Sequence, residues 1–160
     1  MRTHFSLLAT AGLVLAATPA HANDAKMHPG TACDANNLAI KHALGSVVNE
    51  STTAIGVVEC PVIKDSSGAP IVSATARVHN GHPTDQLWCG LYTRNVGQVV
   101  VGFTDDTTPG GGGFDTLTFA PIAGGAVTDY AYMLCVLPKA SNAGLSKVIS
   151  YRTVEANASE

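Results

Sequence analysis

Two histidines and an aspartate lie within the stretch H-N-G-H-P-T-D, residues 79–85, and could form a reactive site. Imidazole nitrogens with a carboxylate are ligands of zinc and copper, and His28 or His42 could complete the set. A small metal-dependent or hydrolytic enzyme that uses His79, His82 and Asp85 is therefore one hypothesis for function.

The same stretch also contains Asn80-Gly81, the strongest short-range signal for a β-hairpin, because both residues accept positive φ. Strand-like patterns precede His79 and follow Asp85, so a hairpin with a slightly long loop explains the spacing. In this interpretation the histidines are exposed loop residues. We favour it over a metal site, and we expect no cofactor.

Acidic residues around a glycine run form a second candidate, since Asp105, Asp106 and Asp115 could supply oxygen ligands to calcium. Their spacing does not follow the EF-hand order, and no glutamate closes the loop. The four glycines at 110–113 lack the Lys-Ser/Thr of a phosphate-binding loop. The segment is more typical of a flexible hairpin loop that could touch a partner.

Catalytic patterns are otherwise weak. No serine occupies a G-x-S-x-G turn, and nothing pairs His42, His79 or His82 with a nucleophile. The carboxylates, Glu59 included, show no spacing that indicates glycoside hydrolysis, because the required separation is spatial. These observations favour a protein that is not an enzyme.

Four aromatic residues suggest a binding surface. Strand side chains alternate between faces, so if Cys89 and Cys135 point one way, the aromatic residues point the other. The resulting surface could stack on sugar rings or anchor a protein, with Gly90 leaving room for a ligand. We nevertheless expect these aromatics to form the core, with the disulfide outside, because large aromatics usually dominate the buried face. The four are Trp88, Tyr92, Tyr130 and Tyr132.

The cysteines, at positions 33, 60, 89 and 135, are even in number and far apart, which favours disulfides over a zinc site or a redox pair. Three pairings are possible. We favour Cys33–Cys60, which ties the N-terminal segment to an early strand. Cys89–Cys135 would then join two long strands.

The N-terminus indicates export. Residues 1–22 combine an uncharged apolar run with an A-x-A triplet, as in a secretory signal peptide, and leave a single domain at 23–160. The formal net charge is −3 and no basic cluster occurs, so we expect neither nucleic acid nor a membrane span. The expected location is secreted or periplasmic.

Short strand patterns alternate with turn residues along the rest of the chain, as in a single antiparallel β-sandwich of jelly-roll or immunoglobulin type. Residues 36–48 favour a strand bent at Gly45 over a helix. The pattern predicts about eight strands, which include 54–60, 71–78, 86–93, 98–104, 116–119, 130–137 and 147–154.

Several motifs resemble a group of small secreted bacterial proteins with two disulfides and no characterised function. The resemblance covers most of residues 23–160 and implies a disulfide-pinned β-sandwich, with no catalytic residues to carry over. It rests on Cys33, Val47-Val48-Asn49, Cys60-Pro61, Leu87-Trp88-Cys89, the segment 132–138 and the segment 149–155.

The sequence therefore predicts an exported, non-catalytic interaction or structural module of the cell envelope or extracellular space. Its expected partner is a protein or a glycan. The alternatives are the enzyme described above and a secreted inhibitor or effector, which a compact disulfide scaffold would also suit.

Overall fold

The computed structural model describes residues 24–35, 40–65, 68–124, 126 and 128–156. These residues form a sandwich of two antiparallel sheets with eleven strands, which confirms the predicted fold class. Sheet A contains β1 (Asp24–Pro29), β3 (Ile40–Ala43), β4 (Ser46–Asn49), β6 (Ile71–Asn80), β9 (Gly113–Phe119) and β11 (Ser146–Glu155). Sheet B contains β2 (Asp34–Ala35), β5 (Gly56–Val62), β7 (Trp88–Arg94), β8 (Val100–Thr107) and β10 (Tyr130–Leu137).

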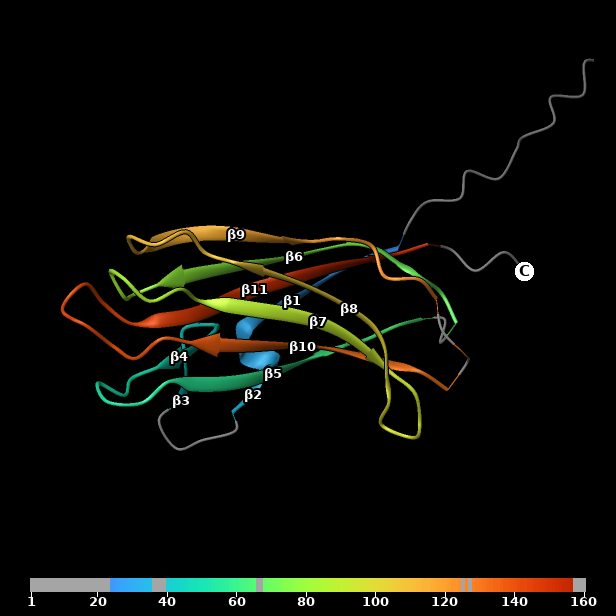
Figure 1. The fold of residues 1–160 in the computed structure, drawn as a ribbon, viewed down its shortest axis with the longest axis horizontal. Coiled ribbons are helices and arrows are strands. Elements are labelled where there is room, and N and C mark those ends of the chain that lie inside the picture. Colours follow the sequence, from blue (N-terminus) through green and yellow to red (C-terminus); the bar gives the residue numbers. More distant parts are fainter. Residues whose placement is uncertain (1–23, 36–39, 66–67, 125, 127, 157–160) are drawn as a thin grey trace, which may run out of the picture.

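The two sheets lie as stacked layers (Figure 1). Sheet A has the order β3-β4-β11-β6-β9, and β1 pairs with the second half of β11, beyond the end of β4. Sheet B has the order β2-β5-β10-β7-β8. The single-turn 3-10 helix η1 (Gly30–Ala32) leads from β1 in one sheet to β2 in the other.

Period-two alternation places the apolar side chains between the layers. In β5, for example, Val58, Cys60 and Val62 are buried while Glu59 and Pro61 are exposed. The described residues contain no helix that is long and apolar enough to span a membrane. The predicted signal peptide lies outside the described residues.

The predicted strands recur with shifted ends. Residues 40–49 form a hairpin of β3 and β4 that turns at Leu44 and Gly45, both with positive φ, which confirms strand over helix there. The strand expected at 54–60 stops before Pro61, which is wrong, because β5 continues to Val62. β2 reaches only Val58 and Glu59, so Pro61 lies where β5 is an edge strand, a position that tolerates proline.

Both predicted hairpin loops are wrong, because each connects two sheets. The Asn80-Gly81 segment leads from β6 in sheet A to β7 in sheet B, and residues 108–112 lead from β8 back to β9. Neither Asn80 nor Gly81 has positive φ. The signal failed because the strands on either side of Asn80-Gly81 pair with other strands.

The disulfides are Cys33–Cys60 and Cys89–Cys135, the favoured pairing. All four cysteines are fully buried between the sheets. The expectation that the aromatics form the core and the second disulfide lies outside is therefore wrong. Cys89 and Cys135 are directly opposite in the β7–β10 ladder and point inward, which turns their neighbours outward.

The ends of β1 and β11 are joined by polar contacts. Lys26 Nζ lies 3.3 Å from Glu155 Oε1 and 2.8 Å from Asp65 Oδ1, and the Asp65 N–H donates to Glu155 Oε2. Between the layers, the Tyr151 hydroxyl donates to the Pro61 carbonyl at 2.6 Å. Burial raises the pKa of Tyr151 to about 12, so this hydroxyl stays protonated and keeps donating across the core.

Gly30 should tolerate no side chain. A Cβ there would lie 2.1 Å from the Val148 carbonyl oxygen, which belongs to backbone and cannot turn aside. We expect Gly30→Ala to lower the free energy of unfolding by about 2 kcal/mol or more, measured by urea denaturation. Gly110→Ala is the matched control, because a Cβ at Gly110 meets nothing within 4 Å. Equal stability of the two variants would contradict close packing of η1 on β11.

Candidate functional site

Five aromatic side chains gather on the outer side of sheet B, and we call this surface the aromatic face: Trp88, Tyr92, Phe103, Tyr130 and Tyr132. They come from the three adjacent strands β10, β7 and β8. The ladder places Tyr132 opposite Tyr92 and Tyr92 opposite Phe103, so three rings form a row across the strands. The outward orientation follows from the inward cysteines of β7 and β10.

Most of these rings pack against each other. Tyr92 and Tyr132 are stacked, with centroids 5.1 Å apart and planes 7° apart, and Phe103 lies 4.8 Å from Tyr92. The Arg94 guanidinium lies 5.2 Å from the Tyr132 centroid. Tyr132 is consequently only 6% exposed, whereas Phe103 is 49% exposed. The middle of the row is a packed ladder, and Phe103 presents apolar surface to solvent at its end.

Trp88 is placed differently from the other rings. A Cβ at Gly90 would lie 2.7 Å from Cη2 and 2.9 Å from Cζ2 of the indole, so the six-membered ring covers the Gly90 backbone. The indole N–H donates to Asp105 Oδ2 at 2.8 Å. Gly90 therefore makes room for Trp88 itself, and not for a ligand, as the less favoured binding-surface hypothesis had it. The indole is held in one orientation and remains partly exposed.

Carboxylates lie on both sides of this indole. The register aligns Glu59, Leu134, Gly90 and Asp105 across β5, β10, β7 and β8. Glu59 and Asp105 are both exposed. A flat apolar ring flanked by hydrogen-bond acceptors suits a ligand with an apolar face and a rim of hydroxyl groups. The carboxylates disfavour an anionic ligand at this position.

Two tyrosine hydroxyls of the aromatic face, those of Tyr92 and Tyr132, are kept protonated. Burial raises the pKa of Tyr92 above its ordinary value, and the nearby Asp105 carboxylate adds to the effect. Burial also raises the pKa of Tyr132, against the opposing influence of Arg94. Tyr130 donates its hydroxyl hydrogen to Gln98 Oε1 at 2.7 Å. The phenols of Tyr92 and Tyr132 therefore act as neutral hydrogen-bonding groups at neutral pH.

The structure keeps His82 and Asp85 together and gives His79 a separate partner. The Asp85 N–H donates to His82 Nδ1 at 3.0 Å, so that nitrogen uses its lone pair as an acceptor. The 3.5 Å contact between His82 Nδ1 and Asp85 Oδ2 is then not an ion pair. His79 Nδ1 faces the Leu145 carbonyl at 3.0 Å and must donate to it.

The other histidines are elsewhere. His28 on β1 stacks on Tyr151 with centroids 4.9 Å apart, and His42 is exposed on β3. Within the described ranges, no group of three or more His, Cys, Asp or Glu side chains is arranged to hold a metal ion.

The acidic residues considered for calcium make local hydrogen bonds. Asp105 holds Trp88, while Asp106 Oδ2 accepts the Thr118 N–H at 2.8 Å and Asp115 Oδ1 accepts the Thr116 N–H at 2.8 Å. Thr104 Oγ1 accepts the Ala120 N–H at 3.2 Å in the same way. The N–H groups of Thr116, Thr118 and Ala120 point away from the sheet at the free edge of β9 and just beyond it. Side-chain oxygens accept these hydrogen bonds, as the backbone of a further strand otherwise would.

Sequence reasoning missed Phe103 and the role of Asp105. The alternation in Val99, Val101 and Phe103 indicates that these side chains share a face. It could not show that Phe103 pairs with Tyr92, because that requires the register across the turn at residues 95–98. The hydrogen bond from Trp88 to Asp105 depends on the same register.

Comparison with known proteins gives a fold and no family. No protein-family model and no curated protein matches the sequence. The CBM36-1 domain of a multidomain xylanase from the hindgut metagenome of Trinervitermes trinervoides matches with a TM-score of 0.50 and 13% identity, over 85% of this chain and 100% of that domain. A carbohydrate-binding module CBM36 in complex with calcium and xylotriose matches with a TM-score of 0.48 and 11% identity, over 81% of this chain and 98% of that one.

A third structure, CsCBM6-3 from Clostridium stercorarium in complex with cellobiose, matches with a TM-score of 0.44 and 14% identity, over 83% of this chain and 94% of that one. At these identities the likeness to the CBM36-1 domain establishes the β-sandwich fold alone.

Proposed function

We propose that this protein is an exported, non-catalytic module that binds a neutral glycan on the aromatic face. The observation that carries the proposal is the orientation of Trp88, whose ring covers the Gly90 backbone and is held there by Asp105. A pyranose ring can stack its C–H face on the exposed side of the indole. Its hydroxyls can donate to the exposed carboxylates of Asp105 and Glu59.

Further support comes from the fold and the expected compartment. The solved CBM36-1 domain with this fold belongs to a xylanase, which is in keeping with a polysaccharide ligand for this chain. Two buried disulfides and the signal peptide expected at residues 1–22 suit a protein outside the cytoplasm. The two pre-packed layers provide a rigid platform, which limits the entropy lost on binding.

Trp88 provides its own measurement, because it is the only tryptophan in the chain. Titration with soluble xylan and cellulose oligosaccharides should shift or quench the intrinsic tryptophan emission in a saturable way. We expect Trp88→Ala to weaken binding about thirtyfold or more, since truncating a central aromatic residue commonly costs about 2 kcal/mol. Binding by this variant is followed by calorimetry, which needs no tryptophan.

Phe114→Ala is the matched control, because Phe114 is an exposed aromatic residue on sheet A. It should bind the same oligosaccharides as the unchanged protein. Equal losses in the two variants, or unchanged affinity in Trp88→Ala, would rule out the aromatic face as the binding surface. A panel of neutral glycans that leaves the tryptophan emission unchanged would argue against the function itself.

A further inference from the structure

The outer side of sheet A carries basic residues that are dispersed in the sequence. Arg77 on β6 and Lys147 and Arg152 on β11 point away from the core, and we call this surface the basic face. The register aligns residues of sheet A in three successive rows that run across β11, β6 and β9, and the first two rows begin on β1 and the third on β4. The rows are Met27-Arg152-Thr75-Thr118, Pro29-Ser150-Arg77-Thr116 and Val48-Lys147-His79-Phe114.

No carboxylate occupies any position in these rows. Within the part of the chain that the structure describes, no ion pair includes Arg77, Lys147 or Arg152. The outer side of sheet B differs, since the carboxylates of Glu59 and Asp105 lie there together with Arg94. The charged residues in the three rows of sheet A are therefore all basic, although the whole chain has a formal charge of −3.

The cations alternate between two neighbouring strands. In the β6–β11 ladder Arg152 is a diagonal neighbour of Arg77, and such neighbours are about 7–8 Å apart, whereas Lys147 lies on the other side of Arg77 beyond a β-bulge between Val148 and Ser150. The three charges thus run in a zigzag along the strand direction. Hydroxyl side chains of Thr75, Thr116 and Ser150 lie beside them in the rows.

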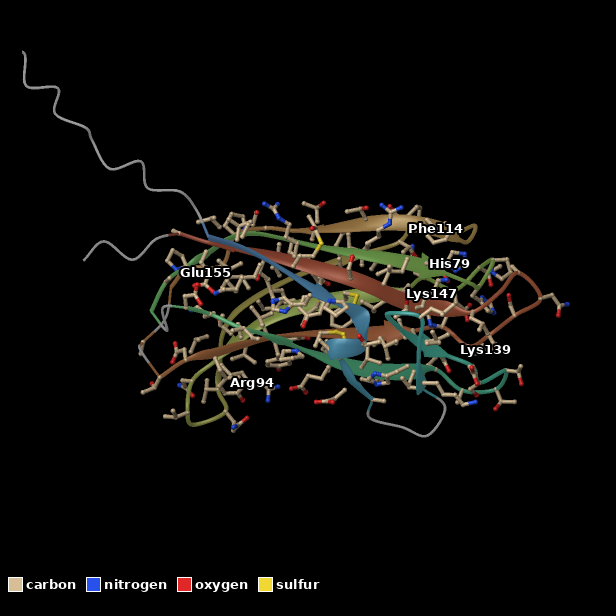
Figure 2. All side chains as sticks on the ribbon, turned by 180° about the vertical axis from the view of Figure 1, so that it is seen from behind. His79, Arg94, Phe114, Lys139, Lys147 and Glu155 are labelled. Carbon is tan, nitrogen blue, oxygen red and sulfur yellow. A yellow bond between two sulfur atoms is a disulfide. The ribbon has the colours of Figure 1, made fainter. Side chains whose placement is uncertain are left out.

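Phe114 marks one end of the zigzag and is 66% exposed. Lys147 Nζ lies 5.6 Å from its ring centroid, and the His79 ring packs edge-on at 4.6 Å. Figure 2 shows Phe114, His79 and Lys147 at one end of the molecule, with Lys139 set apart from them. This end therefore combines an exposed aromatic ring with a cation that has no acidic partner among the described residues.

We propose that the basic face binds a linear anionic polysaccharide, such as a polymer of uronic acid, which lies along β6 and β11. Its carboxylates pair with Arg77, Lys147 and Arg152, and its hydroxyls bond to the neighbouring Thr and Ser side chains. Single-stranded nucleic acid suits the face less well, because its bases need successive aromatic platforms and these rows contain only the Phe114 ring and the smaller His79 ring packed against it. The proposal does not depend on glycan binding at the aromatic face.

The test uses polygalacturonate and its fully methyl-esterified form, which has the same backbone without the charges. In the Trp88→Ala variant, which removes the proposed site for neutral glycans, calorimetry should show binding to polygalacturonate that weakens about tenfold between about 50 mM and about 200 mM salt, and no binding to the ester. The variant with Arg77→Gln and Lys147→Gln should lose at least about tenfold in affinity, and Trp88→Ala should change nothing.

Lys147→Gln and Lys139→Gln form a matched pair, because each removes one positive charge and Lys139 lies off the basic face. Lys147→Gln should weaken binding about threefold or more, while Lys139→Gln leaves it unchanged. Equal losses would mean that only net charge matters, and equal binding of the ester would mean that charge does not. Tighter binding of a single-stranded oligonucleotide of the same charge would overturn the choice of a polysaccharide.

Discussion

Asn80→Asp should lower the free energy of unfolding by about 3–5 kcal/mol at neutral pH, because it leaves a buried charge uncompensated. Asn80 is 2% exposed, and its Nδ2 donates to the Asp85 carbonyl at 2.7 Å and to Thr108 Oγ1 at 3.1 Å. Its Oδ1 accepts the His82 N–H at 3.0 Å. Aspartate would lose both donated bonds, since its contact with the Asp85 carbonyl would join two acceptors and Thr108 would have to reverse its hydroxyl to donate.

The loss should shrink in acid. Burial raises the folded-state pKa of the introduced carboxyl above its unfolded value of about 4, so its protonated form is favoured in the folded protein. The variant is therefore most stable below the unfolded pKa and loses stability as pH rises through the folded one. Urea denaturation at about pH 4 and at about pH 7 measures the difference.

Asn142→Asp provides the control, because Asn142 is exposed in the turn before β11. It should change stability by no more than about 0.5 kcal/mol at either pH. If Asn80→Asp is as stable as the unchanged protein at neutral pH, the hydrogen bonds of Asn80 do not hold the connection between the sheets.

Replacing both Cys89 and Cys135 with alanine should lower the free energy of unfolding by about 4 kcal/mol. The bond spans 46 residues of sequence, and a loop of that length restricts the unfolded chain by about that amount. The two sulfur atoms also fill space at the centre of the sandwich, because both cysteines belong to the cluster of buried core residues. The measurement is a comparison of urea midpoints and slopes for the two proteins.

The same bond should resist reductant while the protein is folded, because both cysteines are fully buried. Reductant in strong denaturant should open it and reproduce the instability of the alanine variant on refolding. A variant within about 1 kcal/mol of the unchanged protein would show that the core alone fixes β7 against β10.

The strand pattern could be predicted because alternation and turn residues are local. Residues 130–137 were expected as a strand and form β10 with the same ends, and the 40–49 region forms a hairpin at Gly45. Pairing across the chain could not be predicted. Asn80-Gly81 carries the local signal of a hairpin, but its flanking strands find their partners in opposite sheets.

The prediction of the candidate sites depended even more on knowing which strands pair. The four aromatics were identified from sequence, but size alone assigned them to the core, whereas the cysteines occupy it. Phe103 was missed because its position relative to Tyr92 requires the register of β8. The basic face was not visible at all, since Arg77 lies far from Lys147 and Arg152 in sequence and becomes their neighbour only in the β6–β11 ladder.

The antiparallel pairing of β1 with β11 has a mechanical consequence. Because Asp24 lies opposite Glu155, tension applied at these two residues pulls across the ladder and opens it one hydrogen-bonded pair at a time. The Lys26–Glu155 contact is near the end that opens first. Once β1 has peeled away, the load reaches Cys33, whose covalent bond to Cys60 prevents the intervening chain from extending. A molecule stretched between these two residues should therefore extend by a short length at low force, before the rest of the sandwich resists unfolding.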